Sequence, residues 1–211
     1  MTNILVLVPM KPNQHVQLKG HVLIMLQRMQ TPGIQIVVDN RGPGDAGICT
    51  LEDRVKHVSA IMNSMITDYL QPYHTHVLWM DADLIDFPAD LPARLMETAQ
   101  QSAIVAPLVC MEYGRPRFYD IAGFVENGQK ASMWPPFFKQ TGRFIELDSV
   151  GTCYMAPAGV FRCGAKYEVV AGFTHHMSVC RKAKEMGYKV LCDTSITVMH
   201  ADLTKYGEKE H

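Results

Sequence analysis

The stretch that decides the fold is Val77-Leu78-Trp79-Met80-Asp81-Ala82-Asp83-Leu84-Ile85-Asp86. Its apolar start is typical of a buried strand, and the run ends in two carboxylates, Asp81 and Asp83. At the carboxyl edge of an α/β sheet such side chains lie in the crevice where these sheets bind ligands. Two neighbouring carboxylates repel each other, and a divalent cation that also binds phosphate oxygens makes their arrangement favourable. We therefore predict a metal–diphosphate site; the alternative is an Asp-x-Asp that occurs in a loop by chance.

The composition is that of one globular domain. The chain has 211 residues, enough to bury a sizeable core, and its net charge of −1 without a long basic tract does not indicate binding to a nucleic-acid backbone. The six cysteines form no Cys-x-x-Cys pair, so we expect free thiols and a reducing compartment. No apolar run approaches the roughly 18 residues that span a bilayer. We expect a cytoplasmic protein, of bacterial or viral type.

Apolar runs and helical periodicity alternate along the chain, which predicts an α/β domain over residues 1–204 and a polar tail over 205–211. We expect strands over residues 4–8, 34–38, 77–80, 103–107, 150–156, 188–192 and 196–200. We expect helices over 15–29, 51–69, 88–100 and 173–186. The glycine-rich loop 41–47 matches neither the Walker nor the dinucleotide pattern, so an ordinary turn is favoured over a phosphate cradle.

Three further features indicate a ligand site. The segment 110–145 is aperiodic and rich in aromatic and charged residues, including Trp134, so it forms either a pocket wall or a surface hairpin. Gly151 begins a predicted strand and, because it has no side chain, would let another group approach the backbone closely. His175 and His176 stand at the start of a helix, a favourable place for a phosphate or another anion.

The order of these features resembles the nucleotide-diphospho-sugar glycosyltransferases of GT-A fold, most of all the Anp1/Mnn9/Van1 mannosyltransferase group and the family 2-like enzymes. The stretches that carry the likeness are 77–86, 105–107, 119–120, 150–162, 171–190 and 198–200. The resemblance implies a single GT-A (Rossmann-like) domain, with a mainly parallel central sheet flanked by helices and a small antiparallel portion. It also implies transfer of a sugar from a UDP- or GDP-sugar to an acceptor hydroxyl, with retention in the mannosyltransferase group.

The resemblance also implies roles for single residues. Asp81, Asp83 and His200 would hold Mn²⁺ or Mg²⁺ on the diphosphate. Catalytic roles fall on Asp83, Asp120, His175 and His176. The residues implied to bind the nucleotide-sugar are Pro9, Met10, Asp39, Arg41, Arg54, Asp81, Ala82, Trp134 and Gly151.

One departure leaves the stereochemistry and the acceptor open. Many inverting relatives carry an acidic pair at the start of the late helix, where this chain has His175 and His176. A histidine is able to act as base near neutral pH, whereas a retaining enzyme needs no strong base because the leaving diphosphate takes the proton. The acceptor is a glycan, a lipid, a protein, a small molecule or a modified nucleic-acid base.

Three other functions compete with this interpretation. A nucleotidyltransferase of related design would carry a glycine-rich lysine signature near the first strand, where only Lys11 is present. A phosphohydrolase would use Asp81 as nucleophile, but such enzymes place that residue after the first strand. A non-catalytic module would bind the sugar without transferring it.

Overall fold

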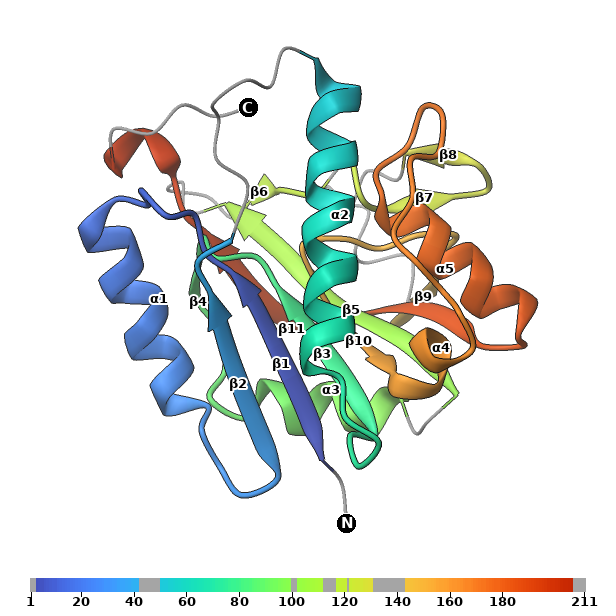
Figure 1. Cartoon of the computed structure of the whole chain (residues 1–211), viewed down its shortest axis with the longest axis horizontal. Helices are drawn as coiled ribbons and strands as arrows, with labels where there is room; N and C mark the ends of the chain where they lie inside the picture. The colour runs from blue at the N-terminus through green and yellow to red at the C-terminus, as the bar shows by residue number, and fades with distance from the viewer. Residues whose placement is uncertain are drawn as a thin grey trace.

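The computed structural model describes residues 3–41, 50–99, 102–111, 117–120, 122–130 and 143–206. Among these residues, nine strands form one sheet, in which seven follow the order β2-β1-β3-β10-β5-β11-β4 (Figure 1). Two short strands lie off this path, β6 beside β5 and β9 beside β11. No helix in the described part of the chain is long and apolar enough to cross a membrane.

The strands alternate with helices along the chain. The strands of the main sheet are β1 (Ile4–Pro9), β2 (Ile34–Asp39), β3 (His76–Met80), β4 (Leu84–Asp86), β5 (Ala103–Met111), β6 (Arg117–Phe118), β9 (Phe144–Glu146), β10 (Cys153–Pro157) and β11 (Lys189–His200). The helices are α1 (Val16–Arg28), α2 (Leu51–Tyr69), α3 (Leu91–Ala99), α4 (Ala158–Arg162), α5 (His176–Glu185) and the 3₁₀ helix η2 (Leu203–Tyr206). A separate hairpin joins β7 (Val125–Glu126) to β8 (Gln129–Lys130).

The two longest pairings, β1 with β2 and β5 with β11, are parallel. β1 also pairs in parallel with β3. The antiparallel portion consists of β10, which lies between β3 and β5, and of the short strands at the margins. The mixed α/β class, with a mainly parallel sheet and a small antiparallel part, is therefore confirmed.

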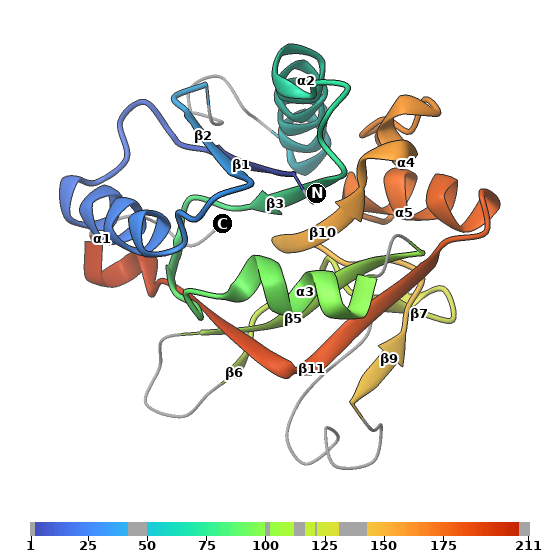
Figure 2. The same cartoon turned by 90° about the horizontal axis from the view of Figure 1, so that it is seen from below.

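Helices cover both faces of the sheet, with α2, α4 and α5 on one face and α1 and α3 on the other (Figures 1 and 2). Successive side chains of a strand point to opposite faces. In β1, Leu5 and Leu7 therefore belong to the core beneath α2, whereas Val6 and Val8 belong to the core beneath α1. Burial on both faces is the reason that the run is apolar without alternation.

The start of α2 is capped by the side chain of Thr50. Thr50 Oγ1 accepts a hydrogen bond of 3.1 Å from the backbone N–H of Asp53. The Thr50 hydroxyl in turn donates to the Asp53 carboxylate at 2.7 Å. The helix therefore begins at Leu51 with one of its unsatisfied N–H groups paired.

The prediction of two late strands, 188–192 and 196–200, is wrong because β11 is continuous from Lys189 to His200. A register shift between Asp193 and Thr197 lets the strand pass through polar residues that resemble a turn. The fully buried Asp193 carboxylate accepts hydrogen bonds from Thr98 Oγ1 at 2.9 Å and Arg143 Nη2 at 3.0 Å. These partners, distant in sequence, compensate the cost of burying its charge.

Several other boundaries differ from the predicted ones. β10 begins at Cys153, so Gly151 precedes this strand and does not begin it, and α3 and α5 begin three residues later than predicted, at Leu91 and His176. β5 continues four residues beyond Pro107 to Met111, because it pairs with β11 along its whole length. The helix η2 includes Lys205 and Tyr206, the first two residues of the predicted tail. The Tyr206 hydroxyl lies 3.1 Å from His21 Nδ1 of α1, so this end of the described chain is tied to the first helix.

Candidate active site

The structure brings Asp83 and His200 together at the carboxyl end of β3 and β11. After Asp81 the chain reverses into β4, which pairs antiparallel with the end of β11 and aligns Leu84 with His200. The backbone N–H of Ala201 donates to the carbonyl of Asp83 at 2.8 Å. As a result, His200 Nε2 lies 3.0 Å from Asp83 Oδ2.

The His200 imidazole is 2% exposed and is held from several sides. Nδ1 lies 2.8 Å from the carbonyl oxygen of Ala201, and the Tyr119 ring stacks on the imidazole with centroids 3.7 Å apart. Burial alone would lower the pKa of His200, but the charge and hydrogen bond of Asp83 outweigh burial and raise it to about 9. The imidazole is therefore protonated at neutral pH and donates from both nitrogens.

Three carboxylates crowd this imidazole. Burial, followed by the charge of Asp83, raises the pKa of Asp81 to about 8, although Trp79 Nε1 donates to Asp81 Oδ1 at 3.1 Å. Burial also opposes ionisation of Asp83, but His200 outweighs burial and keeps the pKa of Asp83 below its usual value. Burial raises the pKa of Asp120 to about 6. The cluster therefore contains more carboxylates than the nearby positively charged side chains neutralise.

Asp120 lies in a space that two glycines leave open. A Cβ atom at Gly123 would stand 2.4 Å from Asp120 Oδ1 and 2.9 Å from the Cα of Gly151. A Cβ atom at Gly151 would stand 3.0 Å from both Asp120 Oδ2 and the His176 ring. The close approach predicted at Gly151 is therefore made by side chains of the protein. The next residue, Thr152, has a φ of +53°, the strained geometry that often accompanies functional sites.

Replacing Gly123 with alanine is expected to destabilise the protein by about 1–3 kcal/mol, because the new methyl group overlaps the Asp120 carboxylate and the backbone at residue 151. Gly20→Ala is the matched control: nothing lies within 4 Å of the place that its methyl group would take in α1, so helix propensity should raise stability by about 0.5–1 kcal/mol. Urea unfolding measures both. Equal effects of the two changes would contradict the close packing around Asp120.

A pocket of about 160 Å³ opens beside the carboxylates. It brings together six residues singled out from the sequence: Pro9, Arg54, Asp81, Ala82, Asp83 and His175.

Five residues without a predicted site role also line the pocket: Lys11, Gln14, Leu18, Val58 and Trp79. Gln14 Nε2 donates to the carbonyl of Ala82 and so ties the turn between the two carboxylates to the segment after β1. In the sequence, the position of Lys11 and Gln14 indicates a place at the pocket, because both follow the carboxyl end of the first parallel strand, where α/β sheets bind ligands.

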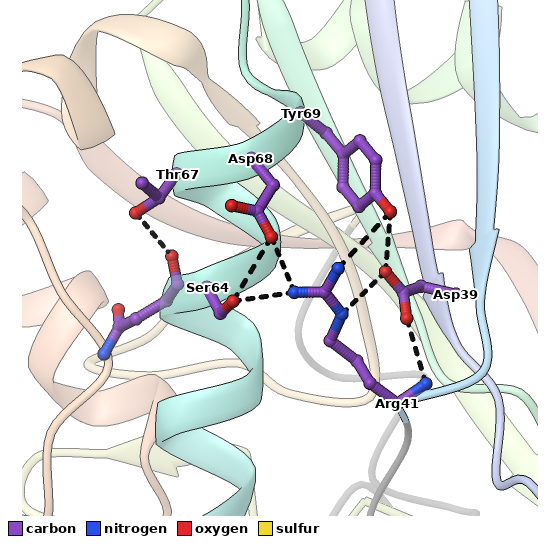
Figure 3. Close-up of polar contacts among 7 residues, drawn as sticks. Asp39, Arg41, Ser64, Thr67, Asp68 and Tyr69 are labelled. Atoms are coloured by element: carbon purple, nitrogen blue, oxygen red, sulfur yellow. Dashed lines mark hydrogen bonds and ion pairs between the residues drawn. The ribbon is translucent and has the colours of Figure 1, made fainter.

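Asp39 and Arg41 do not line this pocket but form a network with α2 (Figure 3). Asp39 Oδ2 accepts from Arg41 Nε and from the Tyr69 hydroxyl, both at 2.7 Å, and Oδ1 accepts from the Arg41 N–H at 2.9 Å. Burial alone would raise the pKa of Asp39, but these hydrogen bonds outweigh burial and lower it. These three bonds use most of the roughly four acceptor sites of a carboxylate, so little of its capacity is left for the nucleoside that the resemblance implies.

Two other predicted residues lie elsewhere. The Met10 side chain is fully buried in the core beneath α1, so only its backbone is available to a ligand. Trp134 lies outside the described residues, as do residues 42–47 of the glycine-rich loop.

The histidine pair at the start of α5 is uncharged at neutral pH. The two rings lie 4.0 Å apart, and each Nδ1 is buried without a hydrogen-bond partner in the described structure. Burial, followed by the charge of Arg54, lowers the pKa of His175 to about 4. Burial, followed by His175, lowers the pKa of His176 well below its usual value. Both imidazoles are weak bases in this state, because an efficient general base has a pKa near the working pH.

The donor atoms of the cluster fit a hard divalent cation. Asp83 Oδ1 and Asp120 Oδ2 are buried and lack hydrogen-bond partners within the described ranges. Carboxylate oxygens are the preferred ligands of Mg²⁺, and Mn²⁺ also accepts imidazole. Among the described residues, however, no three His, Cys, Asp or Glu side chains stand in a metal-binding arrangement, and His200 pairs with Asp83 instead.

Comparisons with known proteins agree with this architecture. Residues 47–135, the part that contains Asp81, Asp83 and Asp120, match the Anp1 family. Comparison with curated protein sequences yields no match.

Among solved structures, S. aureus TarS 1–349 aligns with a TM-score of 0.57 and 9% identity, over 98% of this chain and 63% of that one. Weaker likenesses are 4-diphosphocytidyl-2C-methyl-D-erythritol synthase (TM-score 0.46, 16% identity, 92% and 90% covered) and A197 from STIV (TM-score 0.48, 10% identity, 95% and 85% covered). The chain thus has a GT-A-like fold and is similar to the Anp1 mannosyltransferase family over residues 47–135.

Proposed function

We propose that the protein is a metal-dependent glycosyltransferase that moves a sugar from a nucleotide-diphosphate donor to an acceptor hydroxyl. The observation that carries this proposal is the ion pair of Asp83 with the buried His200, beside a pocket that Asp83 lines together with Asp81, Lys11 and Arg54. The Anp1 match and the GT-A-like fold support a glycosyltransferase or a nucleotidyltransferase.

The charges of the pocket suit a diphosphate bound through a cation. Lys11 and Arg54 attract phosphate oxygens, whereas Asp81 and Asp83 repel them unless a cation lies between. Asp81, Asp83 and His200 would hold Mn²⁺ or Mg²⁺. A cation held there would stabilise the negative charge that develops on the departing diphosphate. Trp79 orients Asp81 through its indole N–H, and the amide of Gln14 fixes the turn at Ala82.

The histidine pair bears on the stereochemistry. His175 and His176 are uncharged and weakly basic, so neither is suited to remove a proton from an acceptor hydroxyl at pH 7. We infer that the proton passes to the departing diphosphate, as in a transfer with retention. The anomeric configuration of the product, read by NMR, distinguishes this route from an inverting one.

A thermal-shift panel tests the proposal. Each UDP- and GDP-sugar is added with and without Mn²⁺, and a donor at about 100 times its dissociation constant should stabilise the protein by roughly 2.7 kcal/mol. Stabilisation should require both the sugar nucleotide and the metal, because the carboxylates repel an unaccompanied diphosphate. A donor that stabilises the protein equally in EDTA would overturn the metal-dependent mechanism.

The nucleotidyltransferase stays as the second candidate because Lys11, which follows the first strand, lines the pocket. Product analysis separates the two reactions. A glycosyltransferase releases a nucleoside diphosphate from a sugar nucleotide, whereas a nucleotidyltransferase releases pyrophosphate from a nucleoside triphosphate and a sugar phosphate. Metal-dependent binding without either product would indicate a sugar-binding module.

A further inference from the structure

The contact between Tyr119 and His200 is unusually close for two aromatic side chains. Their ring centroids lie 3.7 Å apart and their planes are inclined by 18°, so one face of the imidazole is covered. The edge of the imidazole is occupied at the same time, by the carbonyl of Ala201 at Nδ1 and by Asp83 at Nε2.

The backbone holds the Tyr119 ring in place. The N–H of Tyr119 donates to the carbonyl of Val109 in β5 at 2.8 Å. Tyr119 directly follows β6, which pairs with β5. β5 in turn runs parallel to β11 and aligns Met111 with His200, so the backbone that carries the Tyr119 ring is anchored to the strand beside His200. Sites supported by strands are positioned more precisely than sites on loops.

The phenol brings no charge into the acidic cluster. Burial, followed by the charges of Asp83 and Asp81, raises the pKa of Tyr119, so the hydroxyl stays protonated. The Tyr119 ring therefore acts through its shape and not through charge. The torsion that turns an imidazole about its Cβ–Cγ bond is broad, and a stacked ring restricts it.

We propose that Tyr119 is a positioning residue, whose ring fixes the plane of His200 so that Nε2 points toward Asp83 and the proposed cation site. This inference rests on the proposed function. The Ala201 carbonyl selects which imidazole nitrogen faces the site, and Tyr119 selects the plane in which it does so. Side chains that orient a metal ligand in this way affect metal affinity although they do not touch the metal.

The test compares Tyr119→Leu with Tyr119→Phe in the full chain. Tyr119→Leu removes the stacked ring, so Mn²⁺ affinity measured by electron paramagnetic resonance should fall about tenfold. Tyr119→Phe keeps the ring and should bind Mn²⁺ as the unaltered protein does. Tyr73→Leu is the matched control, because Tyr73 contacts His74 with ring centroids 4.4 Å apart away from this pocket, and it should leave Mn²⁺ affinity unchanged.

A second measurement needs no metal. In the metal-free protein, ¹H and ¹⁵N NMR of the His200 ring should show the ring-current shift of a stacked aromatic and one fixed arrangement of the imidazole. Both features should survive Tyr119→Phe, and both should be lost in Tyr119→Leu.

The two measurements separate this inference from the proposed function. Failure of the unaltered protein to bind Mn²⁺ would contradict the metal site, while loss of the fixed imidazole in Tyr119→Leu would still support positioning. Tyr119→Leu with an unchanged His200 spectrum, or with unchanged affinity in a protein that binds Mn²⁺, would overturn the positioning role.

Discussion

Asp83→Ala is expected to weaken Mn²⁺-dependent binding of the sugar nucleotide by at least about a hundredfold, more than the 10- to 100-fold loss typical of residues that only support a ligand. The change removes a proposed metal ligand and also the carboxylate that holds His200 at 3.0 Å. Isothermal titration with the best donor from the thermal-shift panel, with and without Mn²⁺, measures the loss.

The same variant should remain folded but lose about 1–3 kcal/mol of stability, because His200 is buried and its partner is removed. From the sequence alone a carboxylate at a strand end has little structural role, and the ion pair is what adds this cost. Asp83→Asn separates the two effects, since it preserves the shape of the side chain and removes its charge.

Asp86→Ala is the matched control, because Asp86 ends the short strand that follows Asp83 but is exposed. It should bind the donor and the metal as the unaltered protein does. Unchanged metal-dependent affinity in Asp83→Ala, with normal folding, would remove the main support for the proposed function.

Without metal, the protein is expected to lose about 3 kcal/mol of stability as the pH rises from 6.5 toward 9. His200 titrates near 9 and Asp81 near 8 in the folded chain, both above their usual values. The folded state therefore keeps protons that the unfolded state releases. The stabilisation from His200 is complete below pH 6.5 and is lost as the pH rises through its folded pKa.

Urea unfolding in EDTA at pH 6.5, 7.5 and 8.5 measures this slope. The buried thiols of Cys153 and Cys192 have raised pKa values and would contribute at higher pH, so the series stops at 8.5. Below pH 6.5, His175 and His176 act in the opposite direction. Because their pKa values are lowered in the folded chain, their protonation favours the unfolded state, and their contribution to stability increases with pH.

Divalent cations should counteract the loss of stability at high pH, because a bound cation replaces the protons that reduce the repulsion between the carboxylates. The stabilisation by saturating Mg²⁺ should therefore be greater at pH 8.5 than at pH 6.5. His200→Asn provides the control and should flatten the metal-free slope. A metal-free stability that is level or rises between pH 6.5 and 8.5 would contradict the charge arrangement described for the cluster.

Much of the fold follows from local sequence, for a physical reason. A strand buried on both faces needs a continuous apolar run, so the stretch that precedes Asp81 marks β3 without reference to the rest of the chain. Helical periodicity and the Thr50 cap likewise determine where α2 lies and begins. The alternation of such elements is enough to predict the α/β class.

The partners of the polar side chains were decided by the tertiary structure. The sequence places Asp83 after a strand and His200 at the end of another, but only the antiparallel pairing of β4 with β11 puts them 3.0 Å apart. Asp39 likewise lies at the end of a strand, yet its carboxylate accepts a hydrogen bond from Tyr69, which lies at the far end of α2.

The physical reason lies in the range over which each signal acts. Apolar runs and capping residues act within a few positions, so the sequence by itself determined the elements, their order and the two carboxylates that follow β3. Strand pairing and side-chain contacts depend on distant segments, so the tertiary structure alone decided that β11 is continuous and that Gln14 donates to the carbonyl of Ala82. It also decided that the rings of Tyr119 and His200 stack.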